Sequence, residues 1–413
     1  MHTQDYDIIV IGGGLVGAGL ACALGNQPVR VAVVEAFPFD AADQPSFDAR
    51  TVAMSYTSKV IFDSLGLWAD IQQQGATPIK RIHVSDRKHS GLTHLDCREQ
   101  HVEALGYVVE TRILGRVLGQ HIPAFANVDY LCPATLESVS VTQHEARVTL
   151  MQDGQQRVLT TRLVVAADGG RSLVRQQAGV QSWQVGYNQT AVIANVAMDK
   201  PHDNIAYERF TDTGPMALLP SSHPENPDSL YALVWTVRDD QRDALLALDD
   251  AAFLARLQDR FGPRAGRFIK VSQRHDYPLS MMLAKEHVRQ RLAFIGNAAH
   301  TMHPVAGQGF NLGLRDAAAL AQIIMDAQRA GRDAGDLQVL QEYAAWRRSD
   351  HLQAMGFTDG LVRLFSSRLP PIILARNVGL LALDVLPGLK RIVTRQAMGY
   401  VGKLTRLARG LPL

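Results

Sequence analysis

The first 35 residues contain the pattern that most restricts how this chain can fold. Tyr6–Ile11 is a continuous apolar run, which is typical of a strand buried in a parallel sheet. It leads directly into the glycine-rich segment Gly12–Gly17 (GGGLVG), and an Ala- and Leu-rich helix is predicted from there to about Gly25. A second apolar strand, Val31–Val34, ends at Glu35. This order of elements predicts a Rossmann-like α/β unit.

The same segment also predicts dinucleotide binding. A lone G-x-G-x-x-G pattern is a weak signal, but an acidic residue about 20 residues further on, at the end of the next strand, makes it specific. The glycines permit the tight turn and the close approach of a pyrophosphate. The carboxylate of Glu35 is placed to accept hydrogen bonds from the adenosine ribose hydroxyls.

A second glycine-rich stretch lies far along the chain, at Gly296–Asp316. It follows a short apolar run, Leu292–Ile295, and it precedes a helix predicted from about Asn311. Glycines at positions 307 and 309 allow the backbone to approach a ligand, and the N-terminus of the following helix favours negative charge, such as that of a reduced flavin. An ordinary glycine-rich loop that caps a helix fits the same residues.

This stretch resembles the last FAD motif of the class A flavoprotein aromatic hydroxylases, G-D-A-A-H-x-x-x-P-x-x-G-x-G-x-N. Within that family, His303–Asn311 (HPVAGQGFN) is most similar to the hydroxylases of ubiquinone biosynthesis. Asn297 departs from the pattern, because the wider family has Asp there, although an amide oxygen can still accept hydrogen bonds from the ribityl hydroxyls. Asn at this place resembles the branch that hydroxylates the polyprenyl-methoxyphenol intermediate.

Three further residues gain a role from the resemblance. Leu163–Gly169 resembles the family's second FAD motif, in which the Asp, here Asp168, contacts the ribityl chain, although a strand that ends in Asp-Gly is also a common turn. Arg50, at the predicted start of the helix after the second strand, corresponds to an arginine that touches FAD. Arg112, at the start of a predicted helix, corresponds to one that contacts the phosphate or ribityl chain. From the residues alone Arg50 fits a solvent-exposed position equally well, and a surface charge at the helix start is the alternative for Arg112.

The predicted cofactor residues can now be listed. They are Gly12, Gly14, Leu15, Val16, Gly17, Glu35, Arg50, Arg112, Asp168, Asn297, Gly307, Gln308, Gly309, Phe310 and Asn311, with Pro304 and Gly309 expected near the flavin ring.

The predicted fold class is α/β, with three parts. A discontinuous Rossmann-like FAD-binding domain comprises residues 1–80, 105–180 and 285–350, and a C-terminal helical tail comprises 351–413. Residues 81–104 and 181–284 form the inserted substrate domain, because alternating apolar runs after 181 predict an antiparallel sheet. The residues of this sheet expected to contact substrate are Tyr207, Phe210, Met216, Leu218 and Trp235, although packing against helices would explain the same pattern.

The charge of the chain is unevenly distributed. Residues 361–413 contain nine Lys or Arg and one acid, whereas residues 1–360 contain 33 basic and 39 acidic residues. Leu389–Leu413 therefore predicts a basic amphipathic helix that lies on an anionic membrane or on a protein partner, while docking on the acidic body is the alternative. The body has no basic patch interleaved with aromatic residues, so nucleic acid is not expected as a partner.

The resemblance covers most of the chain and implies an enzyme. The implied activity is FAD-dependent monooxygenation of a polyprenylated phenol in ubiquinone biosynthesis, with 2-polyprenyl-6-methoxyphenol as the expected substrate. In that family NAD(P)H reduces the flavin, O2 adds at C4a, and the C4a-hydroperoxyflavin hydroxylates the ring, so no catalytic side chain is assigned. NAD(P)H is expected to bind transiently, because only one nucleotide-binding fold is visible. His300 and His303 lack metal-ligand spacing, so they are expected to be structural and no metal is predicted.

Two other functions fit the same motifs. One is a soluble phenol hydroxylase or flavin reductase of the same fold, and the other is a non-catalytic flavoprotein subunit of a membrane-associated biosynthetic complex. Three dispersed cysteines (Cys22, Cys97 and Cys132) favour a reducing cytosol, and the N-terminus enters a strand without a predicted signal peptide. With the basic tail, these features predict a cytoplasmic protein that is peripheral on the inner face of the membrane, beside other proteins of ubiquinone biosynthesis.

Overall fold

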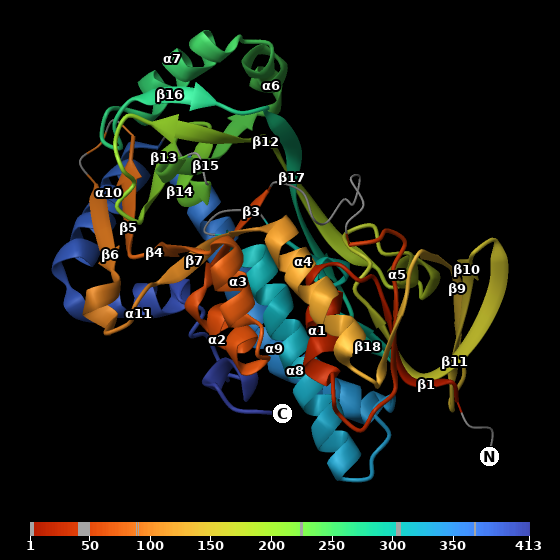
Figure 1. Cartoon of the computed structure of the whole chain (residues 1–413). Helices are drawn as coiled ribbons and strands as arrows, with labels where there is room; N and C mark the ends of the chain where they lie inside the picture. Colours follow the sequence, from red (N-terminus) through yellow and green to blue (C-terminus); the bar gives the residue numbers. More distant parts are fainter. Residues whose placement is uncertain are drawn as a thin grey trace.

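Two large β-sheets organise the chain, with helices between and around them (Figure 1). The computed structural model describes residues 4–39, 50–87, 89, 91–223, 226–302, 307–366 and 369–413. A Rossmann-like unit, an inserted, mostly antiparallel sheet and a group of C-terminal helices are all present, so the predicted α/β fold class is confirmed.

The first sheet contains the N-terminal strand at its centre. Its order is β18 (Val288–Arg289), β19 (Leu292–Phe294), β11 (Gln155–Ala166), β1 (Tyr6–Ile11), β2 (Val31–Val34) and β8 (Val128–Leu131), and β10 (Ala146–Gln152) and β9 (Ala134–Val141) extend from β11. Strands β19, β11, β1, β2 and β8 run parallel. Ile8 and Val10 of β1 pack against the helices, and Ile9 and Ile11 pack against β9–β11, so both faces of β1 are covered. This explains its uninterrupted apolar sequence.

Helices cover one face of this sheet. The innermost are α1 (Leu15–Leu24) and α8 (Gln308–Arg329), which share a core with α2 (Tyr56–Ser64), α3 (Trp68–Gly75) and α4 (Thr111–His121). A short helix, α5 (Leu173–Gln177), follows β11. A small sheet of β3 (Thr51–Ser55), β7 (Gly106–Glu110) and β4 (Thr77–Ile79) adjoins them. Arg50 was predicted to start a helix, which is wrong: it precedes strand β3, which pairs with β7, and the helix begins at Tyr56.

The second sheet is the inserted one. Its order is β20 (His300–Thr301), β17 (His275–Ala284), β12 (Ser182–Met198), β15 (Asn226–Arg238), β14 (Gly214–His223), β13 (Ile205–Thr211), β5 (Arg81–Asp86) and β6 (Leu92–Asp96), and β16 (Phe268–Val271) pairs with β12. Helices α6 (Asp239–Leu246) and α7 (Asp250–Phe261) pack on one face, at the top of Figure 1. The other face looks towards the FAD-binding region.

The C-terminal region differs from its prediction in two ways. Helix α9 (Leu337–Ser366) runs without a break across the predicted domain boundary at residue 350. The single amphipathic helix predicted for 389–413 is wrong, because α10 (Pro370–Val385) is followed by α11 (Pro387–Ala397), and the chain then turns back to the body. Leu407 and Ala408 are buried in the core of the FAD-binding region beside α2 and α8. The final residues are therefore part of the body, as the position of the C-terminus in Figure 1 shows.

Membrane-spanning potential was assessed over the described ranges. No single helix there is long and apolar enough to cross a membrane. Two consecutive helices reach the required length and apolar composition only when they are taken together, and they are bent by 97° relative to each other: Pro371–Val385 and Pro387–Ala397.

Candidate cofactor and substrate site

A connected cavity of about 1270 Å³ joins the sequence motifs that lie far apart along the chain. It is lined by both glycine-rich segments, by β3, by the open face of the inserted sheet and by helices α9–α11. A pocket for one drug-sized ligand measures about 300–1,000 Å³. The cavity is therefore large enough to hold a cofactor and a substrate together.

The Gly12–Gly17 segment forms one end of this cavity and admits no side chains at its turns. Gly12 has φ +100°, and a Cβ there would lie 2.6 Å from the carbonyl oxygen of Ala167. A Cβ on Gly17 would lie 1.9 Å from the carbonyl oxygen of Gly12. Helix α1 begins directly after Gly14 without a capping side chain, so the backbone N–H groups of its first turn can bind a phosphate.

Glu35 lies at the end of β2, on the cavity wall. Its Oε2 accepts a hydrogen bond from the Gly13 N–H at 2.6 Å, and its Oε1 accepts one from the Phe37 N–H at 2.9 Å. These two backbone donors fix the carboxylate in one orientation. The remaining lone pairs can accept the hydroxyl groups of a ribose.

Asp168 provides the clearest test of whether the site fits a polyhydroxylated ligand. Its Oδ2 accepts a hydrogen bond from the Val174 N–H at 3.2 Å, whereas its buried Oδ1 has no partner in the part of the chain that the structure describes. Burial raises the pKa of this carboxyl, against the opposing effect of hydrogen bonds from Ser172 and Val174. An acceptor that is buried on the cavity wall and has no donor is suited to accept a hydrogen bond from a ribityl hydroxyl group of FAD.

The second glycine-rich segment lines the opposite side. Asn297 contributes to the wall. The start of α8 also contributes, through Gly307, Gln308, Gly309 and Phe310. The predicted positions of His303 and Pro304 lie outside the described residues.

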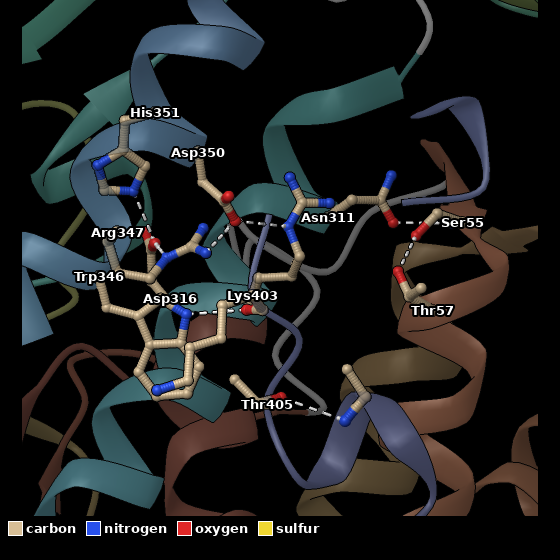
Figure 2. A network of polar contacts seen from close by, with 12 residues as sticks. Ser55, Thr57, Asn311, Asp316, Trp346, Arg347, Asp350, His351, Lys403 and Thr405 are labelled. Carbon is tan, nitrogen blue, oxygen red and sulfur yellow. Dashed lines mark hydrogen bonds and ion pairs between the residues drawn. The ribbon is translucent and has the colours of Figure 1, made fainter. Parts of the chain in front are cut away.

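Asn311 has a structural task in addition to its place on the wall (Figure 2). Its Nδ2 donates to the carbonyl oxygens of Ala53 at 2.8 Å and Gly307 at 2.7 Å. Its Oδ1 accepts from the Ser55 N–H and from the Ser58 hydroxyl, both at 2.8 Å. All of its hydrogen-bonding capacity therefore joins α8 to β3 and α2, and the side chain positions the flavin loop rather than donating to the cofactor.

A buried ionic network lies behind the same loop (Figure 2). Asp316 of α8 accepts hydrogen bonds from His351 Nε2 at 2.7 Å, Arg347 Nε at 2.7 Å and the Gly296 N–H at 3.2 Å, as well as from His300. Arg347 also pairs with Asp350. Burial disfavours ionisation of Asp316, but the neighbouring His351, His300 and Arg347 outweigh it and hold the pKa of the carboxyl well below its usual range.

Burial lowers the pKa of His351 to about 3, although Asp316 acts in the opposite direction. Arg347 pairs directly with Asp316, and its guanidinium is always charged. His300, Asp316 and His351 could together hold a metal ion, but their side-chain atoms already meet at hydrogen-bond distances. The structural role expected for His300 agrees with these contacts.

The two predicted arginines differ in their positions. Arg50 lines the cavity, and its guanidinium carbon lies 5.0 Å from the centre of the Tyr277 ring. Arg112 is exposed at the start of α4, pairs with Glu110 and does not line the cavity. The geometry therefore places Arg50, and not Arg112, on the cavity wall.

The substrate residues chosen from the sequence are correct in part. Phe210 and Tyr207 line the cavity. Met216, Leu218 and Trp235 are buried on the opposite face, in the core beneath α6 and α7, so their assignment to the substrate is wrong. Their neighbours Ala217, Leu219 and Val234 line the cavity instead. Both faces of this sheet are covered, so apolar residues occur on both and the alternation does not reveal which face meets the ligand.

The C-terminal helices contribute a part of the site that the sequence motifs do not mark. The lining residues from α9, α10 and α11 are Phe357, Leu361, Phe365, Leu380, Leu383 and Val393. Phe365 stacks on Phe210 of the inserted sheet, with ring centres 3.6 Å apart. Apolar helix residues of this kind are also typical of ordinary packing, and only the three-dimensional arrangement shows that they face the cavity.

Comparison with known proteins agrees with this geometry. The FAD binding domain family matches residues 5–357. The chain belongs to this family. It is 40% identical over 411 residues to the ubiquinone hydroxylase UbiL of Rhodospirillum rubrum, covering 98% of this chain and 93% of that protein. It is 32% identical over 404 residues to the 3-demethoxyubiquinol 3-hydroxylase of Escherichia coli, covering 97% and 100%.

The fold is shared with a monooxygenase of known structure. The p-nitrophenol 4-monooxygenase PnpA of Pseudomonas putida superimposes with a TM-score of 0.77 at 21% identity, over 96% of this chain and 98% of that one. The family and the two hydroxylase relatives confirm the predicted cofactor and enzyme class: the protein is an FAD-dependent monooxygenase, a class for which NAD(P)H is the typical electron donor.

Proposed function

We propose that the protein hydroxylates the aromatic ring of a polyprenylated phenol in ubiquinone biosynthesis, and that 2-polyprenyl-6-methoxyphenol is the substrate. The observation that carries this proposal is the continuous cavity from the FAD motifs to the apolar side chains of α9–α11. A ring held at the flavin end would extend its prenyl tail along this apolar part. The names of the relatives in Rhodospirillum rubrum and Escherichia coli support the same pathway.

The residues of this chain bind the cofactor, orient the substrate and shield the reacting ring from water. Bound FAD supplies the redox chemistry with O2. Glu35 and Asp168 accept hydrogen bonds from hydroxyl groups of the cofactor, and the first turn of α1 binds the phosphates of the cofactor. Residues such as Leu219 and Val234 exclude water from the reacting ring.

A hydroxylation assay tests the proposal directly. The FAD-loaded protein is supplied with NAD(P)H, O2 and a short-chain 2-prenyl-6-methoxyphenol, and the product is followed by mass spectrometry for the gain of one oxygen atom. We expect Leu219→Trp to block turnover by filling the cavity while FAD content is retained. Ile269→Trp is the control, since Ile269 is 57% exposed on β16, outside the cavity. Consumption of NAD(P)H without any oxygenated product from the wild type would refute the proposed reaction.

We also propose that α10 and α11 contact the anionic inner face of the membrane, where a polyprenylated phenol dissolves. Leu374, Val378, Leu381 and Val385 repeat at helical spacing on α10 and are 43–75% exposed. Ile392 of α11 is 64% exposed, next to the exposed Arg391. An apolar face flanked by positive charge is suited to a surface of anionic lipids.

Vesicle co-sedimentation tests this surface. The combined change Leu374→Glu, Val378→Glu and Val385→Glu is expected to abolish sedimentation with phosphatidylglycerol vesicles but not turnover of a short-chain phenol. The control is Val141→Glu with Val158→Glu, two exposed apolar residues of β9 and β11. Equal sedimentation of the wild type and the triple variant would overturn the membrane role. A wild type that binds no vesicles would overturn it as well, and a protein partner would then be the remaining explanation for this apolar face.

A further inference from the structure

One carboxyl group stands in the apolar wall of the cavity. Glu208 lies at the middle of β13, between Ala206 and Phe210 on the same face of the strand. In register across the sheet it is flanked by Val84 of β5 and Ala217 of β14, and the same row continues to Val234 and Ile193. All of these residues line the cavity, and Glu208 is the charged member of the row.

The surroundings of this carboxyl are apolar along the strand as well. Ala206 packs in a cluster with Ile79 and Val108, and Phe210 packs against Phe365 and Leu380. The side chain of Glu208 is partly exposed, and it lies on the wall of the cavity. Within the described ranges its carboxylate has no hydrogen-bond partner, and burial raises its pKa to about 8. An unpaired carboxyl is costly in such a position, so a ligand group is the natural partner.

The charged groups on the elements next to Glu208 make their contacts elsewhere. Arg376 of α10 donates to Asp86 at the end of β5 at 2.7 Å. On the facing helices, Asp359 pairs with Arg363, and Asp384 accepts from the His94 N–H. Arg50 lies over Tyr277 of β17. His83 of the neighbouring strand β5 and Arg209, which follows Glu208 on β13, face the other side of the sheet.

We infer that Glu208 binds the phenolic hydroxyl of the substrate and takes its proton during hydroxylation. In this step the O–H bond of the phenol breaks, an O–H bond forms on the Glu208 carboxylate, and the electron pair stays on the phenol oxygen. The ring becomes more electron-rich, which favours attack on an electrophilic oxygen. The proton leaves to water when the product departs. Glu208 thus acts as the general base of the site, and this role rests on the proposed phenolic substrate.

Two substitutions separate binding from proton transfer. Glu208→Gln keeps a hydrogen-bond acceptor of the same size but cannot take a proton, so we expect kcat to fall about 100-fold or more with little change in phenol binding. Glu208→Leu removes the acceptor as well. In the wild type we expect the phenol to bind at least about 10-fold more tightly than its O-methyl ether, and Glu208→Leu should lose this preference. Asp228→Asn, an exposed carboxylate on β15, is the matched control.

The measurements are kcat and kcat/KM as functions of pH, equilibrium binding of the phenol and of its ether, and the FAD content of each variant. The wild-type rate is expected to rise with pH through an apparent pKa that is absent in Glu208→Gln. A Glu208→Gln enzyme with unchanged kcat and pH profile overturns the inference, and so does a Glu208→Leu protein that still prefers the phenol. If the wild type binds prenylated phenols but hydroxylates none, the proposed function fails, whereas the binding preference still decides the role of Glu208.

Discussion

His300 Nε2 donates a hydrogen bond of 2.6 Å to Asp316 Oδ2, and both side chains are fully buried. This contact joins the end of the flavin loop to helix α8. Since Asp316 also accepts from the Gly296 N–H and from Arg347 on α9, one carboxylate holds three segments that are distant in the sequence. The shape of the loop around Asn297 therefore depends on a charge that lies behind the cofactor site.

Loss of that charge is expected to weaken both the fold and the cofactor site. Asp316→Asn leaves Arg347 without one of its two carboxylate partners in a buried position, so we expect unfolding to become about 3–5 kcal/mol easier. FAD affinity should fall with it, because the amide cannot accept all the hydrogen bonds of the carboxylate. The control is Asp326→Asn, in a partly exposed pair on the same helix, for which about 1 kcal/mol or less is expected. Denaturant unfolding and flavin fluorescence measure both effects, and equal losses in the two variants would contradict the assigned role of Asp316.

Two buried histidines predict acid sensitivity. His351 contacts Asp316, and His287 Nδ1 lies 3.3 Å from His351 Nδ1. Burial lowers the pKa of His351 to about 3 and that of His287 to about 4, whereas histidine in an unfolded chain titrates near about 6.5. Below pH 6.5 the unfolded state therefore binds protons that the folded state does not, and stability falls as the pH falls. Each histidine contributes about 1.4 kcal/mol per pH unit in this window. His351→Gln should reduce the slope of stability against pH between pH 6 and 4 by that amount, while His144→Gln, at an exposed turn, should leave it unchanged.

The parts of this protein that could be predicted from sequence are those determined by contiguous residues. Tyr6–Glu35 contains a strand, its turn and its helix in sequence, and the steric need for glycine at 12 and 17 is local. The substrate face could not be chosen, because Trp235 and Val234 are both apolar and only the position of α7 shows which of them meets the cavity. Leu407 was placed in a surface helix for the same reason, since its burial depends on α2 and α8, which lie far earlier in the chain.

Asp168 is expected to contribute to FAD affinity through its unpartnered Oδ1. Asp168→Ala removes an acceptor for a buried hydroxyl, which corresponds to a loss of about 1–3 kcal/mol in FAD binding. Asp168→Asn retains an acceptor and should lose less. Asp153→Asn, at an exposed turn between β10 and β11, is the control. Titration of the apoprotein with FAD measures the affinities, and equal binding by wild type and Asp168→Ala would exclude the contact.

The last residues of the chain are expected to be needed for folding. Residues 403–413 bury Leu407 and Ala408, and Trp346 Nε1 donates to the Lys403 carbonyl oxygen at 2.8 Å. Arg406 also pairs with Asp326 of α8 at 2.7 Å. Deletion of 403–413 should therefore lower the stability of the FAD-binding region by about 3 kcal/mol or more. The single change Leu411→Ser, at a position 43% exposed, is the control. A truncated protein that melts at the wild-type temperature and retains FAD would contradict the burial.

The isolated carboxyl group of Glu208 is expected to affect how the stability of the fold depends on pH, which can be measured without an activity assay. Its pKa is raised to about 8 in the folded protein by burial, while in the unfolded chain it titrates near about 4.3. Above that lower value the unfolded state loses a proton that the folded state keeps, so stability declines as the pH rises towards 8. Glu208→Gln removes this decline, by at most about 1.4 kcal/mol per pH unit. The FAD-loaded variant should therefore melt at a higher temperature than the wild type at pH 7.5, and the difference should shrink towards pH 5. A constant difference across this range would show that the carboxyl is ionised and solvated in the folded protein.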